Sequence, residues 1–271
     1  MPRAALLQMT TGIDPVANAA TIVDAVVQAK AGGAQMLFTP EMSGLLQRDR
    51  SRAAALIVRE EDDPVLASVR EAAAREGVWV ALGSLAVARE DGGWANRTFV
   101  IDDQGRIAAR YDKLHMFDVE LATGERWRES SAYTPGDEVV TVETPLGRLG
   151  LSICYDLRFP ALYEALGRAQ CDVIAIPSAF TVPTGQAHWH ILQRARAIEA
   201  SAYVLSAAQV GSHEDGRTTY GHSLGIDPWG EVLLDLGHET KQLGFVDIDP
   251  SRIANVRAQL PSLANRRVMP N

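Results

Sequence analysis

The side chains best suited to nucleophilic chemistry are spread along the chain at Glu41, Lys113 and Cys154. Cys154 follows an apolar stretch that predicts a strand and precedes a segment that predicts a helix. Nucleophiles favour such a junction, because the turn exposes the side chain and the start of a helix lowers the pKa of a thiol. A lone cysteine is more commonly a small buried hydrophobic residue, so Cys154 by itself does not identify a site. Cys171 opens an apolar strand without polar neighbours, and we assign it to the core.

Glu41 and Lys113 stand where strands are predicted to end. Glu41 follows the apolar residues 36–38 closely. Ligands of α/β proteins bind at the carboxyl ends of parallel strands, where a carboxylate can act as a general base. Lys113 is the first residue of a long polar segment, residues 113–136, and loops of that length commonly have a functional role. Taken singly, Glu41 is explained equally well as a solvated loop acid, and Lys113 is better explained as a surface lysine.

The histidines at positions 188, 190, 213 and 222 admit two further interpretations, a metal site or a partner for Cys154. The His-x-His spacing does not specify zinc, and no second cysteine or carboxylate pair completes a site. We therefore expect no metal, and histidines that are satisfied by hydrogen bonds. A cysteine–histidine pair stays open, because chain order does not exclude it. Neither glycine-rich phosphate-binding motif is present, so phosphate-cradle chemistry has no support.

Alternating strands and helices must position these side chains. Helices are predicted to begin at Asp14-Pro15 and at Asp63-Pro64, because aspartate caps a helix and proline suits its first position, and to end at Gly32 and Gly77. Further helices are predicted over residues 160–168, 187–202 and from Asp249, and strands over residues 4–9, 36–38, 78–87, 96–101, 106–111, 139–143, 148–153, 171–177, 203–209, 223–227, 231–236 and 243–248.

Composition excludes several classes of protein. The chain has 271 residues, of which 46% are hydrophobic and 22% charged, enough for a substantial core, and its net charge is −8. An acidic chain without a Lys/Arg-rich run argues against nucleic acid or an anionic membrane as a partner. The longest apolar run, around residues 78–88, is well short of the ~18 residues that span a bilayer. Two cysteines and no secretion signal fit a reducing cytosol, so we expect a cytoplasmic protein.

The sequence contains no internal repeat, low-complexity tract or linker-like boundary that would divide it into domains. We expect one domain over residues 1–271, with a core of about residues 4–248 and a C-terminal helix and tail over residues 249–271. Many strands with helices between several of them predict an α/β fold in which helices cover the outer faces of sheets.

Three segments together resemble the signatures of the nitrilase superfamily, the carbon–nitrogen hydrolases with a Glu–Lys–Cys triad. They are Phe-Thr-Pro-Glu at residues 38–41, Tyr-Asp-Lys-Leu-His at residues 111–115 and Ile-Cys-Tyr-Asp-Leu-Arg-Phe-Pro at residues 153–160. Their order and spacing match, and the resemblance runs from about Ala4 to Arg267. It implies a four-layer αββα sandwich, usually paired into a homodimer, that needs no cofactor.

Later segments resemble the Nit branch of this superfamily, among them Pro-Ser-Ala-Phe at residues 177–180 and Asp-Pro-Trp-Gly at residues 227–230. Residues 207–209 and 220–223 look closer to deaminated glutathione amidases than to ω-amidases. The resemblance implies a cysteine-dependent amidase that hydrolyses the terminal amide of a small carboxylate-bearing metabolite, deaminated glutathione, through a thioester. One alternative is an ω-amidase acting on α-ketoglutaramate or α-ketosuccinamate. The other is a catalytically silent scaffold protein, whose signature would be loss of a triad residue.

The resemblance also implies a role for each site residue. Glu41 would take the proton of Cys154, and Lys113 and the backbone N–H of Tyr155 would stabilise the oxyanion. Glu129 occupies the place of a second carboxylate, expected to hold Lys113 and to position the substrate, although it could also be a solvated loop acid.

Three further residues are candidates for binding the substrate. Arg158 could receive a substrate carboxylate with a bidentate fork, or it could pair with Asp156, and both interpretations stay open. Thr184 is expected to add a hydroxyl contact, and Phe180 is assigned to the same substrate-binding group.

Overall fold

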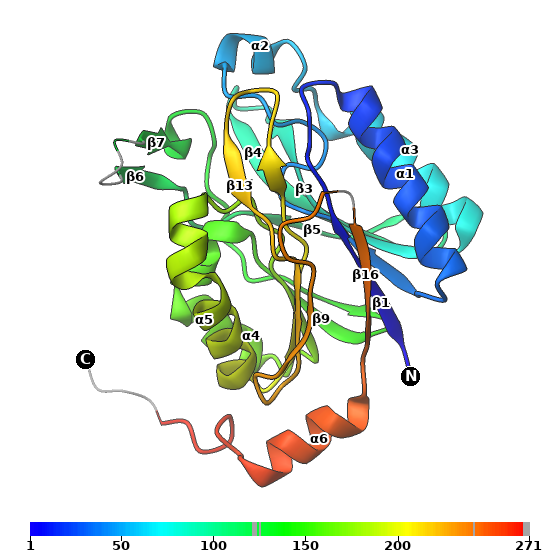
Figure 1. Cartoon of the computed structure of the whole chain (residues 1–271), viewed down its shortest axis with the longest axis vertical. Helices are drawn as coiled ribbons and strands as arrows, with labels where there is room; N and C mark the ends of the chain where they lie inside the picture. Colours follow the sequence, from blue (N-terminus) through cyan, green and yellow to red (C-terminus); the bar gives the residue numbers. More distant parts are fainter. Residues whose placement is uncertain (121–123, 125, 241, 268–271) are drawn as a thin grey trace.

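A computed structural model describes residues 1–120, 124, 126–240 and 242–267. Two six-stranded sheets stack face to face between two pairs of helices (Figure 1). Helices α1 (Pro15–Ala31) and α3 (Pro64–Glu76) cover the outer face of one sheet, and α4 (Pro160–Arg168) and α5 (Val182–Ala200) cover the other. The layers therefore run α, β, β, α, which confirms the expected fold class.

The first sheet is ordered β16-β1-β2-β3-β4-β5. Its strands are β1 (Arg3–Gln8), β2 (Met36–Phe38), β3 (Trp79–Ala88), β4 (Trp94–Ile101), β5 (Ile107–Asp112) and β16 (Gln242–Asp247). Strands β1, β2 and β3 are parallel, whereas β4 and β5 continue the sheet antiparallel on one side and β16 pairs antiparallel with β1 on the other. The last strand of the chain thus closes the sheet that the first strand opens.

The second sheet is ordered β15-β14-β11-β10-β9-β8. Its strands are β8 (Thr141–Thr144), β9 (Gly147–Leu151), β10 (Val173–Ala175), β11 (Tyr203–Ser206), β14 (Leu224–Ile226) and β15 (Val232–Asp235). Here β9, β10 and β11 are parallel, and the remaining strands pair antiparallel at the edges. Each sheet therefore has a parallel centre, and the carboxyl ends of these central strands carry residues of the site.

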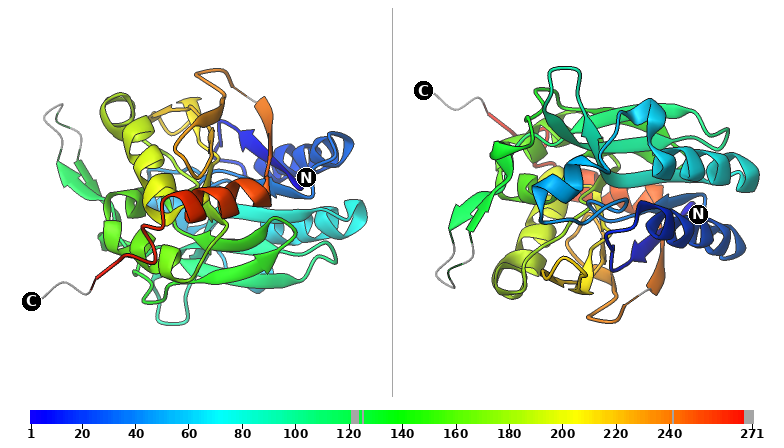
Figure 2. Two further views of the ribbon diagram at one scale, coloured as in Figure 1. Left: turned by 90° about the horizontal axis from the view of Figure 1, so that it is seen from below. Right: turned by 90° about the horizontal axis from the view of Figure 1, so that it is seen from above.

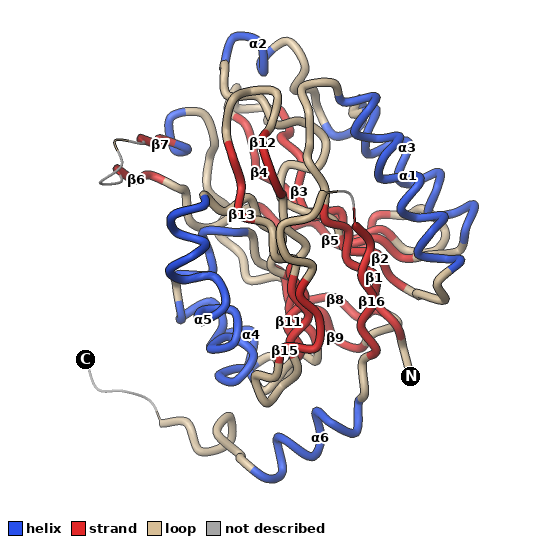
Figure 3. The backbone as a smooth tube through the Cα atoms, viewed as in Figure 1, coloured by secondary structure: helices blue, strands red, loops and turns tan. Residues whose placement is uncertain are grey.

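Short elements fill the connections between the sheets and helices. They are the hairpins β6 (Asp118–Glu120) with β7 (Arg126–Arg128) and β12 (Val210–Ser212) with β13 (Thr218–Tyr220), the helices α2 (Arg50–Ala54) and α6 (Pro250–Gln259), and the 3₁₀ turns Glu60–Asp62, Glu129–Ser131 and Cys154–Arg158. In Figure 3, α2 and the hairpin of β6 and β7 lie at the periphery of the molecule, and α6 follows β16 below the sheets. The tail residues 268–271 lie outside the described part of the chain.

The helices begin where their capping residues predict. The side chain of Asp14 accepts a hydrogen bond from the N–H of Val16 at 2.9 Å, and that of Asp63 accepts one from Leu66 at 2.8 Å. Helix α5 begins five residues before the predicted start at 187, because the proline at 183 lies in the first turn, where its missing N–H costs no bond. Among the helices of the described residues, none is both long and apolar enough to cross a membrane.

The hydrophobic core has two main parts. One lies between α1, α3 and the first sheet, with Ile22, Val69 and Val80 fully buried. The other lies between the two sheets and beneath α4 and α5, and joins residues such as Leu6 and Leu151 from opposite sheets. Figure 2 shows the four layers from below and above. Cys171 is fully buried in this second part, as expected from the sequence.

Candidate active site

Glu41 lies just beyond the carboxyl end of β2, on the inner side of the first sheet, and is only 5% exposed. Its Oε1 accepts hydrogen bonds from Nζ of Lys113 and from Nδ2 of Asn96, both at 2.9 Å. Its Oε2 accepts the backbone N–H of Ala179 at 3.0 Å, which reaches across from the second sheet. The carboxylate is thus held on both oxygens by donors from separate segments.

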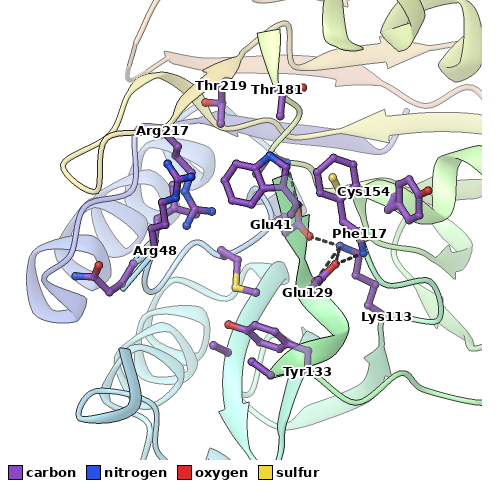
Figure 4. Close-up of a pocket in the computed structure, with 18 of the residues that line it drawn as sticks. Glu41, Arg48, Lys113, Phe117, Glu129, Tyr133, Cys154, Thr181, Arg217 and Thr219 are labelled. Carbon is purple, nitrogen blue, oxygen red and sulfur yellow. Dashed lines mark hydrogen bonds and ion pairs between the residues drawn. The ribbon is translucent and has the colours of Figure 1, made fainter. Parts of the chain in front are cut away.

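Lys113 follows β5 directly and is 2% exposed. Besides Glu41, its Nζ contacts Glu129 Oε2 at 2.8 Å and Oε1 at 3.1 Å. Glu129 begins a 3₁₀ turn after β7 and also accepts the N–H of Phe117 at 2.6 Å. One buried ammonium therefore lies between two carboxylates, as Figure 4 shows.

Cys154 begins the 3₁₀ turn after β9 with a backbone φ of 47°. A residue with a side chain rarely adopts this region, and such strain persists where the surroundings hold it, as at the nucleophiles of other strand-to-helix turns. The N–H of Cys154 donates to the carbonyl of Pro177 at 2.9 Å, which fixes the turn against the second sheet. The structure brings Cys154, Glu41, Lys113 and Glu129 to the wall of one cavity.

The Cys154 thiol is protonated at rest. Burial raises its pKa well above the ordinary value, the negative charge of Glu41 and a hydrogen bond to it raise it further, and Lys113 only partly opposes this. The expectation that a helix start lowers the pKa of this thiol is therefore wrong. The turn at Cys154 is a short 3₁₀ helix, and burial beside a carboxylate outweighs it.

Glu41 and Lys113 are charged at rest. Burial would raise the pKa of Glu41, but the positive charge of Lys113 and the hydrogen bonds from Cys154, Lys113 and Asn96 prevail, so its pKa is lowered. Burial would lower the pKa of Lys113, but Glu129 and Glu41 raise it well above its usual value. The resting site is a neutral thiol beside a carboxylate that accepts a hydrogen bond from an ammonium, an arrangement able to transfer a proton from sulfur to oxygen.

Asn96 is a site residue that sequence reasoning missed. It is 1% exposed on β4, and its Nδ2 donates to Oε1 of Glu41 at 2.9 Å and to Oε1 of Glu129 at 3.1 Å. The sequence assigned residues 96–101 only to a strand. No signal in the sequence distinguishes Asn96, because Arg97 and Thr98 follow it on the same strand and are also polar.

The cavity measures about 360 Å³, within the range of roughly 300–1,000 Å³ typical of small-molecule sites. Tyr155, Arg158, Phe180 and Thr184, all predicted from the sequence, line it. The guanidinium of Arg158 lies 5.5 Å from the ring centre of Phe180, and its Nη1 is 3.2 Å from Nδ1 of His188. The hydroxyl of Thr184 is engaged by the neighbouring Thr181 hydroxyl at 2.8 Å.

The alternative pairing of Arg158 with Asp156 is wrong. Asp156 is fully buried, and its Oδ2 accepts the hydroxyl of Tyr111 at 2.7 Å and the backbone N–H of Ile153 at 2.9 Å. Its other oxygen lies 2.7 Å from Nδ1 of His115. Because Asp156 is occupied beneath the turn, Arg158 instead lines the cavity.

The histidines fall into separate surroundings. His213 is buried, with its ring nitrogens 2.9 Å from the carbonyl of Thr11 and 2.8 Å from the hydroxyl of Thr219. Among the described residues no histidine lines the cavity of Cys154, whereas the ionised carboxylate of Glu41 does. His190, His222 and Asp235 offer ligand atoms within 4.8 Å of one another, a group that could hold a metal ion and that the sequence reasoning had discounted.

The four-layer fold and the buried cluster of glutamate, lysine and cysteine are those of the nitrilase superfamily. A model of the carbon–nitrogen hydrolase family matches residues 3–258, and the chain belongs to this family. It is accordingly a hydrolase of carbon–nitrogen bonds in amides.

Individual relatives agree with this assignment. A protein of Yersinia enterocolitica named deaminated glutathione amidase is 40% identical over 266 residues, covering 97% of this chain and 92% of its own length. The crystal structure of the Caenorhabditis elegans NitFhit protein superposes with a TM-score of 0.90 at 35% identity, and covers 98% of this chain but only 65% of that longer one. A mutant of the amidase from Nesterenkonia sp. AN1, whose active-site cysteine has added acrylamide, gives a TM-score of 0.80 at 27% identity over 96% of this chain and 98% of that one.

Proposed function

We propose that this enzyme hydrolyses the amide of deaminated glutathione through a thioester on Cys154. The observation that carries the proposal is that Cys154 shares one cavity wall with the buried carboxylate of Glu41, which accepts a hydrogen bond from Nζ of Lys113 at 2.9 Å. The 40% identical relative of that name supports the choice of substrate. Deaminated glutathione is a 2-oxo acid joined by an amide to cysteinylglycine, so it carries one carboxylate on each side of the bond that breaks.

The first half of the reaction forms the thioester. Glu41 removes the thiol proton as the sulfur of Cys154 attacks the amide carbon, and the carbonyl oxygen becomes an oxyanion. Nζ of Lys113 and the backbone N–H of Tyr155 receive that charge, and one such donor has been worth about 3–4 kcal/mol elsewhere. Glu41 then gives its proton to the amide nitrogen, the carbon–nitrogen bond breaks, and cysteinylglycine leaves as an amine.

The second half releases the acid. Glu41, again ionised, takes a proton from water as the water oxygen attacks the thioester carbon. The carbon–sulfur bond then breaks, the proton returns to the sulfur of Cys154, and the dicarboxylic 2-oxo acid departs. The enzyme regains its resting protonation state, with Glu41 charged and the thiol neutral.

Other residues hold the groups that react. Glu129 restrains Lys113 through two contacts of 2.8 and 3.1 Å, which prevents the ammonium from following Glu41 as its charge changes. Arg158 receives the carboxylate of the 2-oxo acid, because it lines the cavity and is not paired with Asp156. Phe180 and Thr184 complete the wall around the substrate.

The test is release of cysteinylglycine from deaminated glutathione by three proteins: wild type, Cys154→Ala and Cys171→Ala. Cys171 is the matched control, because it is the other buried cysteine and lies in the core. We expect turnover by the wild type and by Cys171→Ala, and a loss of more than about a thousandfold in Cys154→Ala. Equal turnover in Cys154→Ala would reject the nucleophile.

α-Ketoglutaramate, assayed in parallel, distinguishes the competing functions. Faster turnover of α-ketoglutaramate than of deaminated glutathione would assign the chain to the ω-amidases. No turnover of either substrate by a folded wild type would favour a silent scaffold protein.

We further propose that two copies associate through the outer surface of α5. Ile191 is 70% exposed there and Ile198 43%, and the adjoining turn exposes 47% of Trp229. That turn is tied to the helix, since Nε of Arg194 donates to the carbonyl of Gly230 at 2.7 Å. Ile191 and Ile198 are seven residues apart and so share one face of the helix, and exposed apolar side chains gathered on one face mark interaction surfaces.

A further inference from the structure

The cavity has a charge opposite to that of the protein as a whole. Its wall carries one lysine and two glutamates together with six arginines, whereas the chain has a net charge of −8. The arginines are Arg48, Arg50, Arg126, Arg128, Arg158 and Arg217. Both glutamates are already engaged by Lys113, and of the arginines Arg126 pairs with Glu120 and Arg217 with Asp215, which leaves four without a carboxylate partner among the described residues. The excess of positive charge therefore faces the space that a substrate enters, and it favours an anion with more than one carboxylate.

Two of these arginines share one aromatic ring. The guanidinium carbon of Arg48 lies 5.3 Å from the ring centre of Trp127, and that of Arg217 lies 5.2 Å from it. In Figure 4 both arginines lie on the opposite side of the pocket from Cys154 and Lys113. The pair is thus separated from the reacting groups but opens into the same cavity.

The two arginines differ in how they are held. Arg217 is fixed by Asp215, whose fully buried carboxylate accepts its Nε and Nη2 at 2.7 Å. Arg48 makes no ion pair with any carboxylate of the described residues. Two guanidinium groups near one ring repel each other, and an anion between them removes that repulsion. The buried indole N–H of Trp127 also has no hydrogen-bond partner among these residues.

We propose that Arg48 and Arg217, supported by Trp127, bind the carboxylate of the leaving half of the substrate. This inference rests on the proposed function, in which Arg158 receives the carboxylate of the other half. Deaminated glutathione has such a distal carboxylate on its glycine, whereas α-ketoglutaramate has none. The arginine pair is therefore the feature by which the site selects an amide with a carboxylate at each end.

The variant that tests the proposal is Arg48→Gln. Removing Arg48 leaves no carboxylate unpaired among the described residues, whereas a change at Arg217 would strand the buried Asp215. Arg52→Gln is the matched control. Arg52 lies in α2, a few residues after Arg48, but its side chain is 75% exposed and does not line the cavity.

For deaminated glutathione we expect Arg48→Gln to raise KM about tenfold with little change in kcat, since a remote charge-assisted bond is made equally in ground and transition states. The loss in kcat/KM should be several-fold smaller for α-ketoglutaramate. Arg52→Gln should match the wild type on both substrates. An unchanged KM for deaminated glutathione, or equal losses on the two substrates, would overturn the subsite.

A binding measurement separates this inference from the proposed function. Calorimetric titration of deaminated glutathione into Cys154→Ala and into Cys154→Ala/Arg48→Gln compares affinity without turnover. We expect the dissociation constant to rise about tenfold in the double variant. Equal dissociation constants would reject the subsite even if the wild type is active. An inactive wild type that still shows the difference would reject the reaction and retain the subsite.

Discussion

At the scale of single residues, Cys154, the proposed nucleophile, is held as a thiol rather than a thiolate. The charge of Glu41 that raises the pKa of Cys154 is also the charge that accepts its proton in the proposed reaction. Lys113 lowers the pKa of Glu41 and opposes the rise at Cys154. The lysine thus keeps the base ionised, and the sulfur gains nucleophilicity only as its proton moves to Glu41.

The pH dependence of kcat/KM follows from these directions. Glu41 must be ionised to act as the base, and its lowered pKa keeps it ionised below the usual glutamic range, which centres on about 4.3. The acid limb of the profile should therefore fall below that value, and the rate should be flat from there to neutrality. Because the pKa of Lys113 is raised, we also expect no alkaline limb up to about pH 9. An acid limb near pH 7 would point to a different base.

Asn96 should act as a positioning residue. Its side-chain amide donates to both Glu41 and Glu129, so Asn96→Ala removes one hydrogen bond from each carboxylate. We expect kcat to fall about tenfold or more, because bonds to charged groups are worth ~1.5–3 kcal/mol. The acid limb of the pH profile should also move upward, since the amide helps to lower the pKa of Glu41.

The control for this variant is Asn18→Ala. Asn18 is also buried, but its amide donates to the carbonyls of Gly12 and Gly44, and none of these three residues lines the cavity. It should lose stability without a shift in the pH profile. An unmoved acid limb in Asn96→Ala would show that Asn96 is structural only.

The sequence predicted part of this site. Glu41, Lys113, Glu129 and Cys154 could be proposed because three motifs in order resemble one family, and the structure brings all four to one cavity. Asn96 could not, because a strand assignment does not reveal which side chain lies across the cavity. The arginines opposite Cys154 were missed for the same reason, since they come from loops that meet only in three dimensions.

At the scale of elements, Gly83 in β3 allows the segments before Glu41 and around Pro177 to pack closely against this strand. A Cβ built there would lie 2.0 Å from the carbonyl oxygen of Thr39 and 2.4 Å from that of Pro40, the residues that lead to Glu41. It would also lie 2.7 Å from Cβ of Pro177, whose carbonyl accepts the N–H of Cys154. Only glycine allows this approach of three segments.

Gly83→Ala should therefore weaken both the fold and the reaction. We expect a loss of about 1–3 kcal/mol in the free energy of unfolding from overpacking, measured by urea denaturation. The folded fraction should also have a kcat lower by up to about a hundredfold, because a small displacement of reacting groups is costly. Gly12→Ala is the control, since its Cβ would meet only the flexible end of Glu214 at 3.3 Å. Unchanged kcat in folded Gly83→Ala would contradict this.

Local sequence signals predict where most helices and strands lie, but they do not predict which strands pair. The capped helices α1, α3 and α4 were predicted closely, because Asp-Pro and Pro starts act within a few residues. The hairpin of β6 and β7 within residues 113–136 was missed, since strands of three residues are too short to show a period. The pairing of β16 with β1 could not be predicted, because the two strands lie far apart in the sequence.

At the scale of the whole molecule, we propose that residues 1–271 form a single domain, supported by the family match from residue 3 to 258. Two such domains should associate through α5. Light scattering should give twice the chain mass of 29.3 kDa for the wild type. Ile191→Arg should give the mass of one chain, because a charge cannot be buried in an apolar interface without a partner.

Val16→Arg provides the control for this prediction. Val16 is 69% exposed, as exposed as Ile191, but it lies on α1 at the opposite side of the sandwich. This variant should retain the mass of two chains. A wild type with the mass of one chain would reject the association.

The strand order of the first sheet has a consequence for biosynthesis. Strand β1 is synthesised long before its partner β16 at residues 242–247, so one edge of β1 stays open until β16 has left the ribosome. An open apolar edge is a template for pairing with another chain, and nascent chains emerge at only about 5–20 residues per second. The antiparallel pairing of β1 with β16 can therefore form only after every other strand of the two sheets has been synthesised.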